Sequence, residues 1–77
     1  MSYAVHYSPD CEKVRSQLSS SDRSSLDSGV SAIARDPYGR GTSEMRGRDH
    51  RQASAGKFIV VYQVSAGLMF VTVVRIV

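Results

Sequence analysis

The stretch Gly56-Lys57-Phe58-Ile59-Val60-Val61-Tyr62-Gln63-Val64, followed by Ser65-Ala66-Gly67 and the apolar run 68–77, decides the fold of this 77-residue chain. Both apolar runs are rich in β-branched residues, which favour strands, and a small-residue break between such runs is typical of a hairpin. Residues 58–74 carry no charge, and 17 uncharged residues reach the lower limit for a membrane-spanning helix. The hairpin is favoured because of the break, and because residues 1–57 alone hold too little apolar material for a core.

Two helices are predicted upstream of this hairpin. Ser8 and Pro9 suit the N-cap and first position of the first helix, whose apolar residues recur at helical spacing. The run Ser19–Asp22 breaks that helix and caps a second one, which Asp36-Pro37 ends because the residue before proline disfavours helical geometry. The expected core-facing residues are Cys11, Val14 and Leu18 in the first helix, and Leu26, Val30, Ile33 and Ala34 in the second.

The remaining segments complete an α+β pattern. Alternation in 3–7 predicts an opening strand, and 50–55 predicts a weaker one that turns at Gly56. Residues 36–49 form a basic loop with a short strand near 43–45 as an option. The expected architecture is a single domain over 1–77 of order β-α-α-β-β-β, with a helical hairpin packed on one face of an antiparallel sheet.

Charge and cysteine content narrow the class of protein. Residues 1–34 hold three basic and four acidic side chains, whereas residues 35–77 hold seven basic and three acidic ones, so the C-terminal half is net +4. A basic C-terminal half suggests a polyanionic partner, although a solvated basic surface explains the charge equally well. The lone Cys11 excludes an internal disulfide, and the N-terminus lacks the pattern of a signal peptide, so we expect a cytoplasmic protein.

In the order and spacing of its motifs, nearly the whole chain resembles the RelE/ParE superfamily of toxins from type II toxin–antitoxin systems. The motif residues are Tyr7-Ser8-Pro9, Ala34-Arg35-Asp36-Pro37, Met45-Arg46-Gly47 and, most specifically, the strand 56–64 quoted above. The resemblance implies a toxin whose partner is a cognate antitoxin. A homodimer and a hetero-oligomer with the antitoxin both stay open.

RelE-like members of this superfamily are ribosome-dependent endoribonucleases, or mRNA interferases, that cut messenger RNA and inhibit translation without a metal or cofactor. The alternative is a non-catalytic or ParE-like binding module, either a DNA gyrase inhibitor or a degenerate toxin that only binds its antitoxin. Ile59 stands where the family's strand carries an arginine, and Gln52 and Ser54 fall where basic residues usually alternate. The chain stops at Arg75-Ile76-Val77, where the family's basic C-terminal cluster would follow. These departures are the basis of the alternative.

The resemblance and the charge pattern together give a set of candidate site residues. His50 is the candidate for proton transfer because histidine titrates near neutrality, with Arg51 as a second catalytic candidate. A solvated histidine beside Asp49 is the other interpretation of His50. Arg75 is a candidate for pairing with an antitoxin carboxylate. The candidate RNA-binding residues are Arg40, Arg46, Arg48, Arg51 and Lys57.

Overall fold

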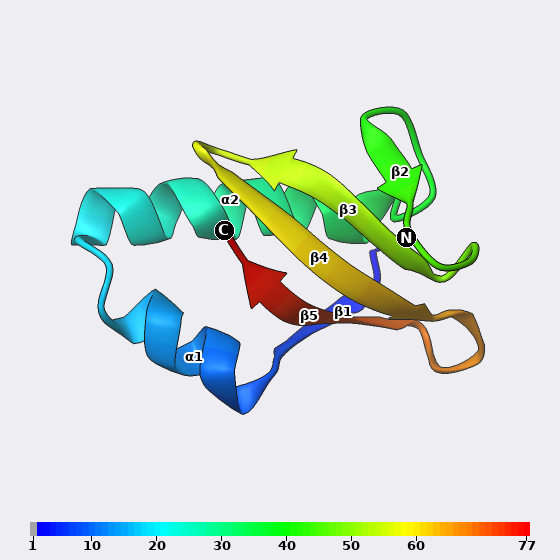
Figure 1. Ribbon diagram of the computed structural model, residues 1–77, viewed down its shortest axis with the longest axis horizontal. Coiled ribbons are helices and arrows are strands. Elements are labelled where there is room, and N and C mark those ends of the chain that lie inside the picture. The colour runs from blue at the N-terminus through cyan, green and yellow to red at the C-terminus, as the bar shows by residue number, and fades with distance from the viewer. Residues whose placement is uncertain (1) are drawn as a thin grey trace.

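The structure is a computed structural model that describes residues 2–77, and it confirms the α+β fold (Figure 1). The elements in chain order are β1 (Ala4–Tyr7), α1 (Pro9–Ser16), α2 (Ser20–Arg35), β2 (Thr42–Glu44), β3 (His50–Ala55), β4 (Phe58–Ser65), the 3-10 turn η1 (Ala66–Leu68) and β5 (Phe70–Ile76).

The helix caps lie where the sequence placed them. The backbone N–H of Cys11 donates to Ser8 Oγ at 3.3 Å, and the N–H of Asp22 donates to Ser19 Oγ at 3.2 Å. Each bond satisfies one of the donors that a helix N-terminus leaves unpaired. Two serines therefore divide the helical region into α1 and α2.

The five strands form one mixed sheet in the order β1-β5-β4-β3-β2. The consecutive strands β2 to β5 pair antiparallel, as their short connections predict. β1 instead pairs parallel to β5, so the expectation of a wholly antiparallel sheet was wrong for this edge. The physical reason is that α1 and α2 lead the chain from β1 to β2 at the opposite edge of the sheet. The three antiparallel connections that follow then bring β5 beside β1 in the same direction, and only such a long connection allows a parallel pair.

Two boundaries differ from the sequence pattern. The optional short strand exists but spans Thr42–Glu44, one residue earlier than expected. The apolar run from Leu68 does not enter the sheet at once, because η1 occupies 66–68 and Met69 adopts a left-handed φ of 56° before β5 begins. Leu68 is consequently 73% exposed.

Within residues 2–77, the structure has no helix whose length and apolar character would carry it across a membrane.

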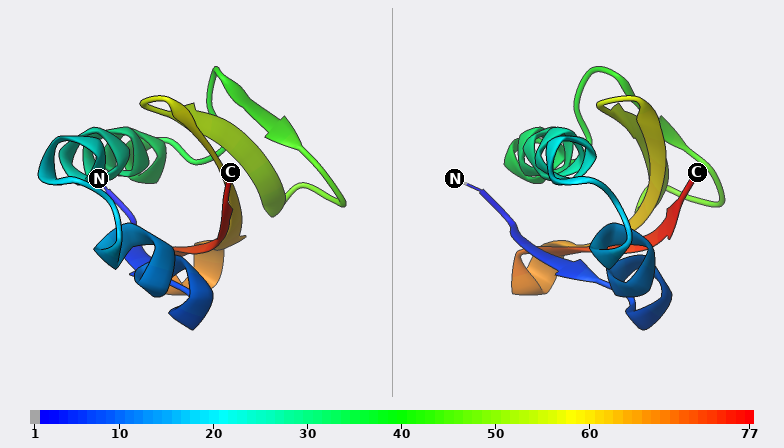
Figure 2. Two further views of the ribbon diagram at one scale, coloured as in Figure 1. Left: turned by 60° about the vertical axis from the view of Figure 1, so that its left-hand side comes forward. Right: turned by 90° about the vertical axis from the view of Figure 1, so that its left-hand side faces the viewer.

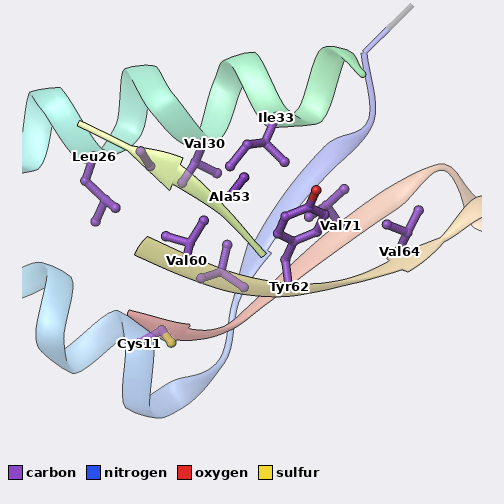
Figure 3. Close-up of a cluster of buried hydrophobic side chains, with 11 residues drawn as sticks. Cys11, Leu26, Val30, Ile33, Ala53, Val60, Tyr62, Val64 and Val71 are labelled. Atoms are coloured by element: carbon purple, nitrogen blue, oxygen red, sulfur yellow. The ribbon is translucent and has the colours of Figure 1, made fainter. Parts of the chain in front are cut away.

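Both helices contribute to one core on the concave side of the curved sheet (Figures 2 and 3). Leu26, Val30 and Ile33 of α2 point at β3 and β4, while Cys11 of α1 joins the same cluster from below. Tyr62 of β4 is fully buried at its centre. The face of the sheet that carries this core is the inner face, and the opposite one is the outer face. Side chains along a regular strand alternate between the two.

Tyr7 shows that α1 and α2 share that side of the sheet. Its hydroxyl donates to Asp27 of α2 at 3.1 Å, and the guanidinium of Arg15 from α1 lies 5.5 Å from the centre of its ring. Arg15 and Asp27 also form a two-pronged ion pair with bonds of 2.8 and 2.6 Å. One cluster therefore ties β1, α1 and α2 together.

Candidate nucleic-acid interface

The face of the sheet opposite the helices, termed here the outer face, is not covered by any other element among residues 2–77 (Figure 2). Strand register and side-chain alternation decide which residues lie on it. The outer face consists of Ala4, His6, Ser43, His50, Gln52, Ser54, Ile59, Val61, Gln63, Ser65, Phe70, Thr72 and Arg75.

A row of polar side chains crosses the outer face at the end near the β2–β3 loop. His6 is opposite Thr72, Thr72 is opposite Gln63, and Gln63 is opposite His50. Four neighbouring strands make this row about 14 Å long. Imidazole, amide and hydroxyl groups both donate and accept hydrogen bonds, so the row can bind the polar edges of a flat ligand.

The outer face carries no acidic side chain among the residues that the structure describes. Asp22 pairs with Lys57 at 3.0 Å, Asp27 pairs with Arg15, and Asp49 accepts the hydroxyl of Tyr38. Glu44 is opposite Arg51, which lies on the inner side of β3, so Glu44 does not lie on the outer face either. A face with histidines, amides and one guanidinium but no carboxylate suits an anionic ligand.

The two catalytic candidates lie on opposite faces of β3. His50 is half-buried on the outer face, whereas Arg51 is only 8% exposed and points inward. The guanidinium of Arg51 donates to Thr42 Oγ1 at 3.2 and 2.9 Å and to the carbonyl oxygen of Arg48 at 3.1 Å. Arg51 therefore fastens β2 and the β2–β3 loop to β3, and the structure does not bring it together with His50.

Tyr38 organises the loop between β2 and β3. The guanidinium of Arg48 lies 4.3 Å from the centre of the Tyr38 ring, and the Tyr38 hydroxyl donates to the carboxylate of Asp49. That hydrogen bond is the main reason why the pKa of Tyr38 is raised. Arg46 and Arg48 are both exposed in this loop, which borders the His50 end of the outer face.

The other two basic candidates lie elsewhere. Lys57 lies in the β3–β4 turn, at the far end of β3 from Arg46 and Arg48, and pairs with Asp22 of α2. The six residues of β3 separate Lys57 from the loop with Arg46 and Arg48 by about 17 Å. Arg40 lines a cavity of about 400 Å³ between α2 and β2. The five predicted RNA-binding residues thus do not form one surface.

Several residues of the outer face were not singled out from the sequence as candidates. These are Gln63 and Thr72 in the polar row, and Ser43 in the row that runs through Gln52 and Val61 to Arg75. Alternation in β4 was a signal that could have found Gln63, because it is the polar residue between the apolar Tyr62 and Val64. Ser43 and Thr72 are placed on this face by strand pairing.

The arrangement supports proton transfer at one place and charge neutralisation at another. His50 can take or give a proton at the edge of the polar row. Arg75 lies two strands away, about 10 Å laterally, so the two side chains would meet different parts of one extended ligand.

No protein-family model and no curated protein matches the chain. Solved structures do match, over 99% of the chain in each case. A chain of the toxin–antitoxin complex RelBE2 from Mycobacterium tuberculosis matches over 96% of its length, with a TM-score of 0.82 and 15% identity. An arginine double mutant of the E. coli toxin RelE in the free state matches over 82%, with a TM-score of 0.80 and 22% identity.

A chain of the archaeal RelE–RelB complex from Pyrococcus horikoshii OT3 matches over 93% of its length, with a TM-score of 0.76 and 18% identity. At these identities the likeness establishes the fold. The class defined by that fold is a small α+β domain with a mixed sheet and two helices on one face. The chain has the fold of the RelE toxins, as its motifs indicated.

Proposed function

We propose that this protein is the toxin of a type II toxin–antitoxin module, a cytoplasmic RelE-like endoribonuclease that cuts messenger RNA on the ribosome and inhibits translation. The observation that carries the proposal is the likeness over 99% of the chain to RelE structures from a bacterial complex, an archaeal complex and a free toxin. Fold alone does not determine chemistry, so a proposed activity needs support from the residues of the outer face.

The outer face supports RNA chemistry in two respects. It is open and lacks acidic side chains within residues 2–77, so a polyanion can approach it without repulsion. Cleavage through the ribose 2′-hydroxyl needs a group that accepts its proton. His50 is proposed for that role because it lies at the end of the polar row that borders the loop with Arg46 and Arg48. Arg46 and Arg48 of the adjoining loop are proposed to contact phosphates of the ribosome.

The other candidate residues take different roles in this proposal. Arg51 holds the loop in place and contacts no phosphate, because its three hydrogen bonds use the guanidinium inside the protein. Arg40 and Lys57 lie off the outer face and could only meet ribosomal RNA that wraps around the domain.

Induced expression in a bacterium tests the activity. We expect growth arrest and cleavage of messenger RNA on ribosomes, mapped by primer extension. His50→Ala should slow cleavage by about 100-fold or more, the usual contribution of a general acid or base. Arg35→Ala, at the exposed end of α2 on the helix side of the sheet, is the control and should cleave normally. Intact messenger RNA in the wild type would contradict the proposal, and inhibition of gyrase supercoiling would then favour the ParE-like alternative.

The proposed partner is an antitoxin, because two of the matching structures are RelE–RelB or RelBE complexes. A domain of 77 residues buries a modest core, and a bound segment would stabilise it by mass action. Co-expression of the protein encoded by the neighbouring gene should restore growth, and the two chains should co-purify. Failure of every neighbouring product to bind or to restore growth would contradict this part of the proposal.

A further inference from the structure

The cavity of about 400 Å³ that Arg40 lines lies between α2, the turn that leads into β2, and β3. Its volume is within the range of sites that bind small molecules. Small and apolar residues of α2 and β3 line part of it, among them Ala32, Ile33 and Ala53, whereas the turn contributes Asp36 and Arg40. The cavity shares no residue with the polar row of the outer face, so it is a separate feature of the molecule.

The turn between α2 and β2 is held in place by its own hydrogen bonds. The backbone N–H of Gly39 donates to the carbonyl oxygen of Asp36 at 3.0 Å, and the N–H of Thr42 donates to the carbonyl oxygen of Gly39 at 3.2 Å. The Thr42 hydroxyl donates to the same Gly39 oxygen at 2.7 Å. The Asp36 carboxylate lies against Gly39, where a Cβ atom would overlap its Oδ2 atom. Glycine at position 39 therefore leaves the space that this carboxylate occupies.

Two opposite charges line the cavity without meeting each other. Within residues 2–77, the side chains of Asp36 and Arg40 form no hydrogen bond and no ion pair, either with each other or with another residue. A carboxylate binds an ammonium group, and a guanidinium binds a carboxylate, through charge-assisted hydrogen bonds. Ile33 and Ala53, both buried, give the same cavity an apolar wall.

We propose that this cavity binds a free α-amino acid with an apolar side chain. Asp36 binds its ammonium group, Arg40 binds its carboxylate, and its side chain lies against Ile33 and Ala53. A zwitterion is favoured because a phosphate would be repelled by the Asp36 carboxylate, and a purely cationic ligand by the Arg40 guanidinium. This site goes beyond the proposed function and does not depend on it.

An NMR titration of the full chain, labelled with nitrogen-15, provides the test, with L-phenylalanine as the probe. We expect saturable shifts of the backbone amides of Gly29, Gly41 and Ala53, which line the cavity, and a Kd of about 1 mM for so small a ligand. N-acetyl-L-phenylalanine lacks the ammonium charge, and L-phenylalaninamide lacks the carboxylate. Each should bind about 10-fold more weakly, which corresponds to the loss of one charge-assisted hydrogen bond.

Variants of the two charged residues assign the two ends of the ligand. Arg40→Gln should weaken binding of L-phenylalanine about 10-fold and leave binding of L-phenylalaninamide unchanged, because the amide has no carboxylate for Arg40 to bind. Asp36→Asn should likewise leave only N-acetyl-L-phenylalanine unaffected. Arg35→Gln removes the same charge as Arg40→Gln from the exposed end of α2, outside the cavity, and should bind L-phenylalanine as the wild type does.

Two results with the wild-type protein would overturn the inference. One is the absence of saturable shifts at the cavity up to about 10 mM L-phenylalanine, which is well above the expected Kd. The other is equal binding of L-phenylalanine and its two analogues, which would mean that the charges are not recognised. Growth arrest and messenger RNA cleavage in cells judge the proposed function separately.

Discussion

Arg51 is the clearest case of a residue whose role depends on which face of a strand it occupies. Its buried guanidinium makes three hydrogen bonds that connect β2, β3 and the loop between them. Arg51→Ala removes all three, and we expect a loss of about 2–3 kcal/mol in the free energy of unfolding. Urea unfolding measures it, with the exposed Arg46→Ala as a control expected to change stability by less than about 0.5 kcal/mol. Wild-type stability of Arg51→Ala would show that these bonds are not maintained in solution.

Tyr62 is buried completely, and its hydroxyl still has a partner. It donates to the carbonyl oxygen of the buried Pro37 at 2.7 Å, which attaches the segment after α2 to the middle of β4. Burial is also the main cause that raises the pKa of Tyr62. Tyr62→Phe keeps the ring but leaves that carbonyl without its donor, so we expect a loss of about 1–3 kcal/mol in the free energy of unfolding. A thermal unfolding midpoint equal to that of the wild type would contradict this expectation.

Among the elements, α2 lies very close to β3 at Gly29. A Cβ atom built there would lie 2.4 Å from Ala55 Cα and 2.6 Å from Ala55 Cβ. Gly29→Ala should therefore destabilise the protein by about 1–3 kcal/mol through overpacking, although alanine favours a helix by about 1 kcal/mol over glycine. Ser28→Ala, at the exposed neighbouring position, is the control and should be neutral or slightly stabilising. If Gly29→Ala were the more stable variant in urea, the close approach of α2 to β3 would be wrong.

The cluster that joins β1, α1 and α2 makes stability depend on pH. Hydrogen bonds from Arg15, and secondarily from Tyr7, hold the pKa of Asp27 below its ordinary value of 3.8. The unfolded chain therefore binds this proton at a higher pH than the folded one does. The stabilisation that Asp27 contributes is therefore fully present at a pH above its ordinary pKa. It is lost as the pH falls through the lower pKa that Asp27 has in the folded protein.

We expect Asp27→Asn to be less stable than the wild type at neutral pH and to lose less stability between about pH 5 and pH 3. Urea midpoints measured across that range would show two curves that converge in acid. Parallel curves for the two proteins would contradict the role given to Asp27.

The elements themselves were largely predictable because their signals are local. Serine caps, the proline after α2 and the glycine between β3 and β4 each act within a few residues, and the structure has them in those places. The parallel pairing of β1 with β5 depends on where a 16-residue helix returns the chain, which no local pattern encodes. The start of β5 was missed because Leu68 is apolar, yet it lies in an exposed turn.

The site was less predictable than the fold for a related reason. Charge and motif position selected His50 and Arg51 together, but adjacent residues of a strand face opposite sides. The position of Arg75 depends on a bulge, and the uncharged run 70–74 gives no sign of this change of register. To know which face of the sheet a residue occupies, one therefore needs to know how the strands pair, and the sequence of one strand does not contain that information.

The whole molecule has the dimensions of a close-packed domain. Its radius of gyration is 11.4 Å, against about 11.5 Å expected for 77 residues. One cluster of buried residues takes members from α1, α2, β3, β4 and β5, and side chains of β1 pack against it. β2 contributes nothing to that cluster among the described residues and is attached through β3.

A single shared core should make unfolding cooperative for everything except β2. We expect urea transitions followed by tyrosine fluorescence, to which all four tyrosines contribute, and by far-UV circular dichroism, which reports on the helices, to have the same midpoint. The slope should be about 1 kcal/mol per molar urea. Backbone amides of Thr42–Glu44 should exchange with solvent well before those of β4, because an edge strand of three residues can open locally. Arg51→Ala should accelerate that exchange further, since it removes the side-chain bonds to Thr42. Separate midpoints for helices and sheet would mean that α1 and α2 are not held by the core that the structure assigns to them.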